Sequence, residues 1–579
     1  MALTAPSESP AIVVKEVDLT SGVPNIPTST GAFVGNFSWG PCDIPTLVSN
    51  EATLVGTFGS PDTDNTVDFH SASYYLRYSN DLYVVRDYTS VAKNASDTNA
   101  SSVPLVTNRD NFDGQQAQLT TDTHNFIAKY PGTLGNSLRV SFSGQGDADY
   151  DNWPYKSYYD AAPGTSDFAT AAGATNDEAH VAVIDEDGAI TGTAGTVLET
   201  FPFVSIALGA KTSDGTSNYI LNVINSRSQY VWLASVPTAT FGTNAGSAPA
   251  SGLDFAAGLT SDFNVSLVGG VNSAALGAAD FATGFDKFED PNALAIDFMI
   301  APGMASAADH ATVVNDMIAT AQSIRKDCMV IASPNRSAVV GQTTSAAAVS
   351  AISSAMTSNA FTRSSYLAVD NNYLKVYDKY NDQYIFIPAA SSTAGIMAAT
   401  DNNFAPWFSP AGTRRGQYFG VTSLAYSPNK SERDTLYKAG INPIANIPGQ
   451  GILLYGDKTH LARPSAFDRI NVRRLFLVLE RAIAAAAQNI LFEFNDEFTR
   501  AEFVNIVEPL LRDVKGRRGI TDFKLVCDET NNTPLIIDSN QFIASLFIKP
   551  ARSINFITLN FVAVRTGVTF EEVVGTSGV

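Results

Sequence analysis

Hydrophobic and polar residues alternate along this chain with periods that change from region to region. Residues 264–404 contain short, continuous apolar segments, Leu294–Pro302, Cys328–Pro334 and Tyr366–Asp370, which helix-like stretches separate. Continuous apolar runs of this length are typical of strands that are buried on both faces. Strands that alternate with helices form a parallel sheet with right-handed crossovers. The pattern therefore predicts a parallel α/β sheet in this region, with helices over Ala305–Arg325 and near Thr344–Ser358.

The region from residue 120 to 263 follows a period of two instead. From Leu138 to Phe142, apolar residues alternate with polar ones, as in a strand with one buried face. The segment His180–Phe201 has the pattern of a hairpin, with Asp187 and Gly188 in the turn. Polar loops rich in Gly, Ser and Thr connect these segments. The pattern predicts a β-rich domain.

Two amphipathic helices are predicted in the last third of the chain. In the first, over residues 471–490, Arg473 and Arg474 fall largely off the apolar face. That face consists of Val472, Leu475, Phe476, Leu479, Ile483, Ala486 and Ile490.

The second helix is expected to begin at Thr499, because Thr499 and Glu502 have the spacing of a capping box. Pro509 should kink this helix or end it early, and Gly516 is a suitable C-terminal stop. Strands are then predicted at Phe523–Asp528, Leu535–Asp538, Phe542–Ile548 and Ile554–Val564, which are rich in β-branched and aromatic residues.

Each end of the chain carries a strand-like segment with no obvious partner nearby. These segments are Ser9–Thr20 and Thr566–Val574. An unpaired strand exposes backbone N–H and C=O groups, which proteins either cover or pair with another chain. A frayed terminus or a local edge strand is the simpler interpretation.

Length, cysteine content and the lack of long apolar runs favour a multidomain protein that stays inside the cell. A chain of 579 residues is too long for one core. Its three cysteines, Cys42, Cys328 and Cys527, are far apart and suit buried free thiols in a reducing compartment. The first residues lack the pattern of a secretory signal, and no apolar run approaches membrane-spanning length, so we expect neither export nor membrane insertion.

The net charge of −20 argues against nucleic acid as a partner. It is unevenly distributed: residues 411–579 carry 20 Lys and Arg against 17 Asp and Glu, whereas residues 1–410 carry 17 against 40. Either an acidic surface keeps a large exposed region in solution, or the last part of the chain faces an acidic partner.

Catalytic and ligand-binding signatures are absent from the sequence. The five histidines show no metal-ligand spacing, and no Gly-rich loop followed by Lys and Ser or Thr suggests a nucleotide site. No Gly-Thr-Ser-Met turn or His-Gly turn of a subtilisin-type protease occurs. His310 is interpreted as an exposed helix residue, with Ser306 as a helix cap. We expect no enzyme activity and no cofactor.

An ordered set of motifs spans about 170 residues of the last third. It begins with APWFSPAGTRRG (Ala405–Gly416) and AGINPI (Ala439–Ile444), and it continues with PGQGILLYGDKT (Pro448–Thr459), RINVRRLFLVLERAI (Arg469–Ile483) and LFEFNDEFTRAEF (Leu491–Phe503). In this order the set resembles the C-terminal region of contractile phage tail sheath proteins. KYPGTLGNSLRVSF (Lys129–Phe142) likewise resembles a pattern common in that family.

The resemblance implies an α+β multidomain architecture. The expected parts are an N-terminal arm (1–20), a subtilisin-like α/β central domain (21–90 with 264–404), an inserted, protruding outer β-rich domain (120–263), an inner, tube-facing α+β domain (405–565) and a C-terminal arm (566–579).

The function implied by the resemblance is structural. Sheath subunits stack as hexameric rings around a tail tube, in contact with baseplate and tail terminator proteins, and contract to drive the tube through a cell envelope during genome ejection. Such a protein is assembled in the host cytoplasm and resides in the virion tail. The sheath of a phage-derived bacteriocin or contractile injection system is an alternative of the same class. A secreted subtilisin-like hydrolase is disfavoured by the missing signal and catalytic residues.

Two groups of residues are the candidate sites. The arms are expected to exchange between subunits through Ile12, Val13, Val14, Lys15, Val17, Val568, Phe570 and Val574. The tube-facing candidates are Arg512, Lys515, Arg517, Arg518, Arg473 and Arg474. For the first four, a solvated helix end is the competing interpretation.

Overall fold

The computed structural model describes residues 28–97, 104–122, 124–144, 150–259 and 263–555. The chain divides into two compact units, residues 1–491 (unit 1) and residues 492–579 (unit 2). The arm residues Ile12, Val13, Val14, Lys15, Val17, Val568, Phe570 and Val574, together with most of the predicted strand Ile554–Val564, lie outside the described residues.

Unit 1 is built on a seven-stranded sheet in the order β16-β12-β11-β10-β1-β3-β2. All neighbouring pairs are parallel except β2 with β3. The parallel sheet predicted from the apolar runs is therefore confirmed. The strands are β1 (Gly31–Gly35), β2 (Thr46–Val48), β3 (Leu82–Arg86), β10 (Phe298–Ile300), β11 (Met329–Ala332), β12 (Leu367–Asp370) and β16 (Ile441–Asn442).

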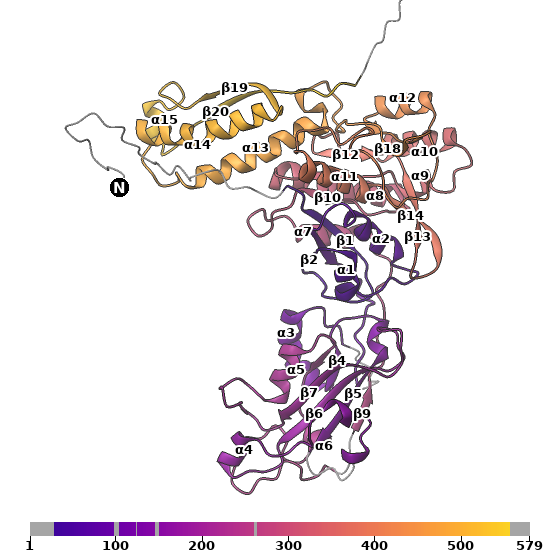
Figure 1. The fold of residues 1–579 in the computed structure, drawn as a ribbon, viewed down its shortest axis with the longest axis vertical. Helices are drawn as coiled ribbons and strands as arrows, with labels where there is room; N and C mark the ends of the chain where they lie inside the picture. The colour runs from indigo at the N-terminus through magenta and orange to yellow at the C-terminus, as the bar shows by residue number, and fades with distance from the viewer. Residues whose placement is uncertain (1–27, 98–103, 123, 145–149, 260–262, 556–579) are drawn as a thin grey trace, which may run out of the picture. The chain divides into compact units, whose positions relative to one another are not determined.

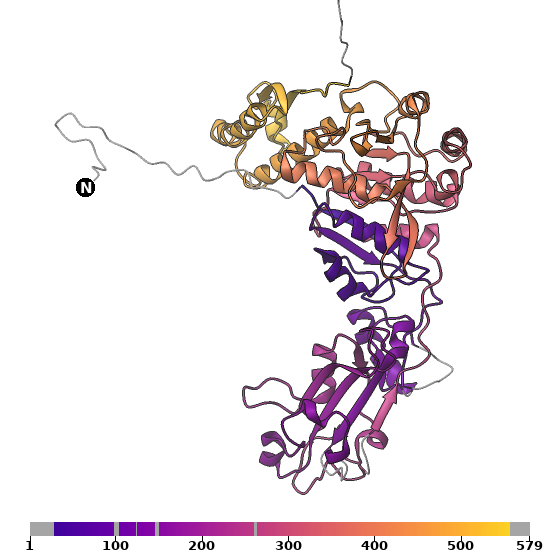
Figure 2. The ribbon, with the colours of Figure 1, turned by 45° about the vertical axis from the view of Figure 1, so that its right-hand side comes forward.

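Helices cover both faces of this sheet, as Figures 1 and 2 show. Successive strand residues point to opposite faces, so the sheet contributes to two apolar cores. One core contains residues of α7 (Ala278–Asp286), α8 (Ala307–Ala319), α10 (Ser345–Ser358) and α12 (Lys430–Lys438). The other contains residues of α1 (Glu51–Phe58), α2 (Thr66–Tyr75), α11 (Ala390–Asn403) and α13 (Ile470–Gln488).

The β-rich region lies between β3 and β10 in the sequence. Its main sheet has the order β7-β6-β5-β9, with all pairs antiparallel. The hairpin predicted over His180–Phe201 is confirmed, but a loop of residues 186–195, rather than a tight turn, joins its strands. The elements are α3 (Arg109–Thr121), β4 (Phe126–Ala128), β5 (Leu138–Gly144), α4 (Asp167–Ala172), β6 (Glu178–Asp185), β7 (Thr196–Ser205), α5 (Ile220–Arg227), β8 (Val231–Leu233), α6 (Thr238–Phe241) and β9 (Phe263–Ser266).

Besides the antiparallel pair of β4 with β8 in the β-rich region, the described residues of unit 1 form two small antiparallel sheets. One has the order β14-β13-β15, and the other pairs β17 with β18. Their strands are β13 (Tyr373–Asp378), β14 (Gln383–Pro388), β15 (Ser423–Leu424), β17 (Ile444–Ile447) and β18 (Gly451–Leu454). A short helix, α9 (Arg336–Val339), precedes α10.

Unit 2 packs one long helix against a two-stranded sheet. The helix α14 (Glu497–Gly516) precedes β19 (Ile520–Val526), α15 (Pro534–Asp538) and β20 (Ser545–Pro550), and β19 pairs with β20 in antiparallel register. The small buried apolar core consists of Phe503, Val507, Leu511, Val514 and Ile520.

Two sequence-based predictions fail in unit 2, and one of the two alternatives for Pro509 is excluded. The cap of α14 is Asp496, whose carboxylate accepts a hydrogen bond from the N–H of Thr499 at 2.9 Å, so the helix begins before Thr499. Pro509 does not end the helix early, because it lies on the exposed face, where water can satisfy the carbonyl that loses its partner. Leu535–Asp538 is helical, with Pro534 at the first helical position, where its missing N–H has no cost.

Candidate functional site: assembly surfaces

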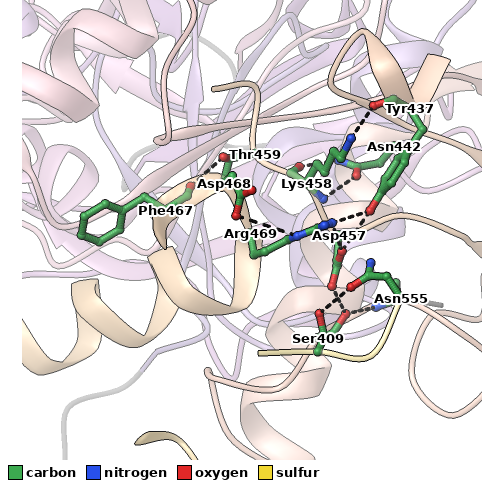
Figure 3. Close-up of polar contacts among 12 residues, drawn as sticks. Ser409, Tyr437, Asn442, Asp457, Lys458, Thr459, Phe467, Asp468, Arg469 and Asn555 are labelled. Carbon is green, nitrogen blue, oxygen red and sulfur yellow. Dashed lines mark hydrogen bonds and ion pairs between the residues drawn. The ribbon is translucent and has the colours of Figure 1, made fainter. Parts of the chain in front are cut away.

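The GDKT and RINVRR motifs meet at the start of α13. The Asp457 carboxylate accepts hydrogen bonds from Arg469 at 3.0 Å and from Ser409 at 3.0 Å, and its backbone oxygen accepts from the N–H of Ile470 (Figure 3). Lys458 exchanges two 2.8 Å hydrogen bonds with Asn442 of β16. The motif residues therefore fix the start of α13 to the edge of the large sheet, which is a scaffolding role.

The arginines at the start of α13 are buried. Arg474 is 2% exposed and pairs with Asp401, and Arg473 is 7% exposed and donates to the hydroxyl of Ser365. Burial lowers the pKa of Arg474 to about 10, although the nearby Asp297 carboxylate opposes this shift. The prediction that these two side chains fall outside the buried face is wrong, because the first turns of α13 are buried all round.

A third arginine holds the middle of α13 to the sheet. Arg481 pairs with Asp297 at 2.9 Å and donates to the backbone oxygens of Ile296 and Asp327 at 2.9 and 2.7 Å. A buried guanidinium is stable only when carboxylates and carbonyls replace its water. These contacts attach α13 to the large sheet, beside β10 and β11.

The cations at the end of α14 have the opposite environment. Arg512, Lys515, Arg517 and Arg518 are all exposed. Arg512 pairs with Glu508 at 2.8 Å and Lys515 with Asp522 at 3.2 Å. These partners lie around a depression of about 440 Å³, which Phe523 also lines. The group forms a charged surface on which cations and carboxylates are mixed.

Unit 2 also exposes an unusual amount of apolar surface. Phe492 is 98% exposed, Phe494 83% and Phe498 85%, and on a second segment Leu535 is 77% exposed. The first segment, residues 492–498, lies close to the second, residues 535–541, because the side chain of Asn495 donates a hydrogen bond to the backbone oxygen of Gln541 at 2.8 Å. Exposed apolar groups of this size mark interaction surfaces in soluble proteins.

The structure decides the two predictions made for α8 and the one made for the cysteines. His310 is buried at 1% exposure on α8, so its interpretation as an exposed residue is wrong, and burial lowers its pKa to about 4. Ser306 caps α8, as predicted, by accepting the N–H of Asp309 at 3.3 Å. Within those residues, no group of His, Cys, Asp and Glu could hold a metal ion. The three cysteines are free and buried, as expected.

Comparison with known proteins finds one family along the chain. Residues 274–460 match the model of the phage tail sheath protein central domain, and residues 462–563 match that of the phage tail sheath C-terminal domain. The chain is 32% identical to the tail sheath protein of Enterobacteria phage T4, over 98% of this chain and 99% of that protein. The chain belongs to the phage tail sheath family.

Further relatives of this sheath protein agree. The tail sheath protein of Vibrio phage KVP40 is 31% identical over 98% of this chain and 99% of its own length. The sheath tail protein Lin1278 of Listeria innocua has a similar fold, with a TM-score of 0.53 and 11% identity over 91% of this chain and 96% of that chain. The protein is thus a structural component of a contractile phage tail.

The structure places the predicted site residues of the sheath protein in different environments. The arms lie outside the described residues. Arg512, Lys515, Arg517 and Arg518 have the exposure that a partner surface requires, whereas Arg473 and Arg474 do not. In the described part of the chain, no helix is long and apolar enough to cross a membrane.

Sequence reasoning missed the acidic partners of α13. Asp297 lies inside the apolar run Leu294–Pro302, and a carboxylate in a buried strand requires a cation nearby. The position of Asp297 in this run was therefore the sequence signal for a buried ion pair. Asp401 gave no comparable signal, because it lies in the polar last turn of α11.

Proposed function

We propose that copies of this sheath protein polymerise as stacked hexameric rings around a tail tube, and that the stack shortens to drive the tube through the host cell envelope. The observation that carries the proposal is the incomplete packing of unit 2. In the described residues its sheet has two strands, so β19 and β20 each have one edge without a strand partner. A two-stranded sheet is marginal in water and gains stability from further strands.

The terminal arms are the proposed additional strands. Their apolar residues are Ile12, Val13, Val14, Val17, Val568, Phe570 and Val574, with Lys15 among them. Each backbone hydrogen bond that an arm forms with a neighbouring copy would contribute roughly 0.5–1.5 kcal/mol net. Arms that stay paired while rigid units move would let the polymer shorten without coming apart.

The end of α14 is the proposed contact with the tube. Arg512, Lys515, Arg517 and Arg518 are exposed, and they belong to the part of the chain that is not acidic overall. Ion pairs with Glu508, Asp522 and Asp513 already engage three of them, so an acidic tube surface would have to compete with these carboxylates. This competition makes the contact dependent on ionic strength.

Several finer features belong to the same proposal. The large parallel sheet of unit 1 is proposed to be subtilisin-like in fold without enzyme activity, and the chain to assemble in the host cytoplasm with baseplate and terminator proteins as partners. The similarity to phage sheath proteins, at 31–32% identity, extends over 98% of this chain, which favours a phage tail over a bacteriocin or injection machine.

Deletion of residues 1–18 tests the arm mechanism. The truncated chain should remain a folded monomer by circular dichroism but should form no striated tubes in negative-stain micrographs, because neighbouring copies lose their linking strand. A single substitution within the arm sharpens the test, because V14D should impair polymerisation of an otherwise intact chain. Normal tubes from the truncated chain would contradict the proposal.

A further inference from the structure

A basic pocket in unit 1 is not explained by the contacts described so far. It has a volume of about 300 Å³ and is lined by Arg363, Lys438, Lys458 and Arg463 with a single carboxylate, Asp468. This excess of cations occurs in a chain whose net charge is −20. The pocket lies beside the GDKT motif and the end of α12 and includes no residue of unit 2.

Two of the cations are held in place by the fold. Lys458 donates to the backbone oxygen of Tyr437 at 2.9 Å and lies over the Tyr437 ring at 3.9 Å (Figure 3). Arg363 donates to the backbone oxygen of Ala439 at 2.7 Å. Both acceptors are carbonyls at the C-terminal end of α12, where cations are favoured. The base of the pocket is therefore a fixed arrangement of positive groups.

The other two cations have no partner among the described residues. The side chains of Lys438 and Arg463 are exposed and form no hydrogen bond or ion pair within that part of the chain. Asp468, the one carboxylate that lines the pocket, lies 3.9 Å from the side chain of Arg469 and faces four lining cations. His460 adjoins Arg363, but burial and the Arg363 charge lower its pKa to about 4, so it adds no charge at neutral pH.

We propose that this pocket receives a carboxylate-bearing surface segment of a second copy of the chain. Guanidinium and ammonium groups recognise carboxylates through charge-assisted hydrogen bonds. Residues 1–410 carry 40 Asp and Glu against 17 Lys and Arg, so a neighbouring copy offers an excess of carboxylates to this pocket. The inference rests on the proposed polymerisation and adds an electrostatic contact between subunits to it.

The test is the salt dependence of polymerisation by the full-length chain, followed by light scattering and negative-stain microscopy. The charge reversal K438E/R463E and the neutral pair K438Q/R463Q should each raise the critical concentration at least about tenfold at low salt. Both should also lose most of the dependence on NaCl that the unaltered chain shows. The control K211E/K430E changes the net charge by the same amount as K438E/R463E, at exposed lysines outside the pocket, and should polymerise like the unaltered chain.

The outcomes separate the two proposals. If the unaltered chain forms no polymers at any salt concentration, the proposed function fails and this contact fails with it. If the pocket variants, folded by circular dichroism, polymerise like K211E/K430E, the pocket contact alone is overturned. If inorganic phosphate raises the melting temperature of the unaltered chain but not of K438Q/R463Q, while both polymerise equally, the pocket is a small-anion site and the proposal is overturned.

Discussion

The helices α13 and α14 follow one another in the sequence, contain 19 and 20 residues and both carry arginines, yet they use them in opposite ways. Arg474 and Arg481 of α13 pair with carboxylates inside unit 1. Arg512 of α14 is 71% exposed and pairs with Glu508 one turn away on the same helix. The same residue type attaches one helix to a core and forms the surface of the other.

The difference depends on where the carboxylate partner lies in the sequence. Asp297 is 184 positions from Arg481, whereas Glu508 is four positions from Arg512. A local ion pair forms on any exposed helix and contributes little to stability, whereas a distant one forms only when the chain has folded. Buried arginines therefore report tertiary structure, and exposed ones remain available to other molecules.

Removing the arginine that pairs with the buried Asp297 should have the largest effect. R481A leaves Asp297, at 3% side-chain exposure, without its closest cation and leaves two carbonyls without a donor. Breaking a buried pair by removing one partner costs about 3–5 kcal/mol. Urea unfolding of the full-length chain should show this loss in the free energy of unfolding.

The matched control for R481A is R512A, which removes an exposed ion pair on α14. Its effect on the free energy of unfolding should be below about 1 kcal/mol. Equal losses in the two variants would contradict the distinction between the helices.

Buried carboxyls should make unit 1 sensitive to pH. Asp370 is 1% exposed, and burial raises its pKa to about 7, although hydrogen bonds from Thr393 and the N–H of Asn372 oppose the shift. Because the folded pKa lies above the unfolded value, protonation stabilises the fold, and this contribution is lost as the pH rises toward 7. Relative to D370N, the unaltered chain should lose about 2–3 kcal/mol of unfolding free energy between pH 5 and pH 8.

Unit 2 provides the control for this pH effect. Asp522 is exposed, and hydrogen bonding and attraction by Lys515 lower its pKa, so D522N should show no such difference between pH 5 and pH 8. An identical pH profile for the unaltered chain and D370N would contradict the assignment.

The smallest effect on stability is expected from the exposed phenylalanines of unit 2. F494S/F498S should change the free energy of unfolding by no more than about 0.5 kcal/mol, because both rings are solvated in the free subunit. The same variant should polymerise less readily if these rings face a neighbouring copy. The matched control is F503S on the buried face of α14, which should cost about 3 kcal/mol or more. A similar loss in F494S/F498S would show that the two rings support the fold itself.

The sequence predicted the elements with the strongest periodicity. The apolar runs predicted strands β10, β11 and β12, and α13 was placed within two residues of its observed bounds. The short segment Leu535–Asp538 was mistaken for a strand, because four residues do not distinguish the two periods and Pro534 was the only helix signal. His310 was predicted to be exposed, but its ring packs against that of Phe361, which lies 51 positions later in the sequence.

The candidate site was less accessible to sequence reasoning than the fold. The basic pocket gathers Arg363, Lys438, Lys458 and Arg463 from three separate segments, and no helical or strand pattern in the sequence brings these segments together. The burial of Arg473 and Arg474 likewise depends on residues from distant strands and loops. Helical periodicity gives the direction of a side chain around its own axis but does not reveal the element that covers it.

One feature of the large sheet has a consequence for engineering. β1 pairs with β3 on one side and with β10 on the other, so the chain leaves the sheet and returns to it on either side of the same strand. The more than two hundred residues between them can change in length without altering the register of any pair in the sheet. The loop of exposed residues 191–195 within this insertion is consequently a suitable place to graft a foreign epitope or an affinity tag, displayed on every copy of a subunit that still folds.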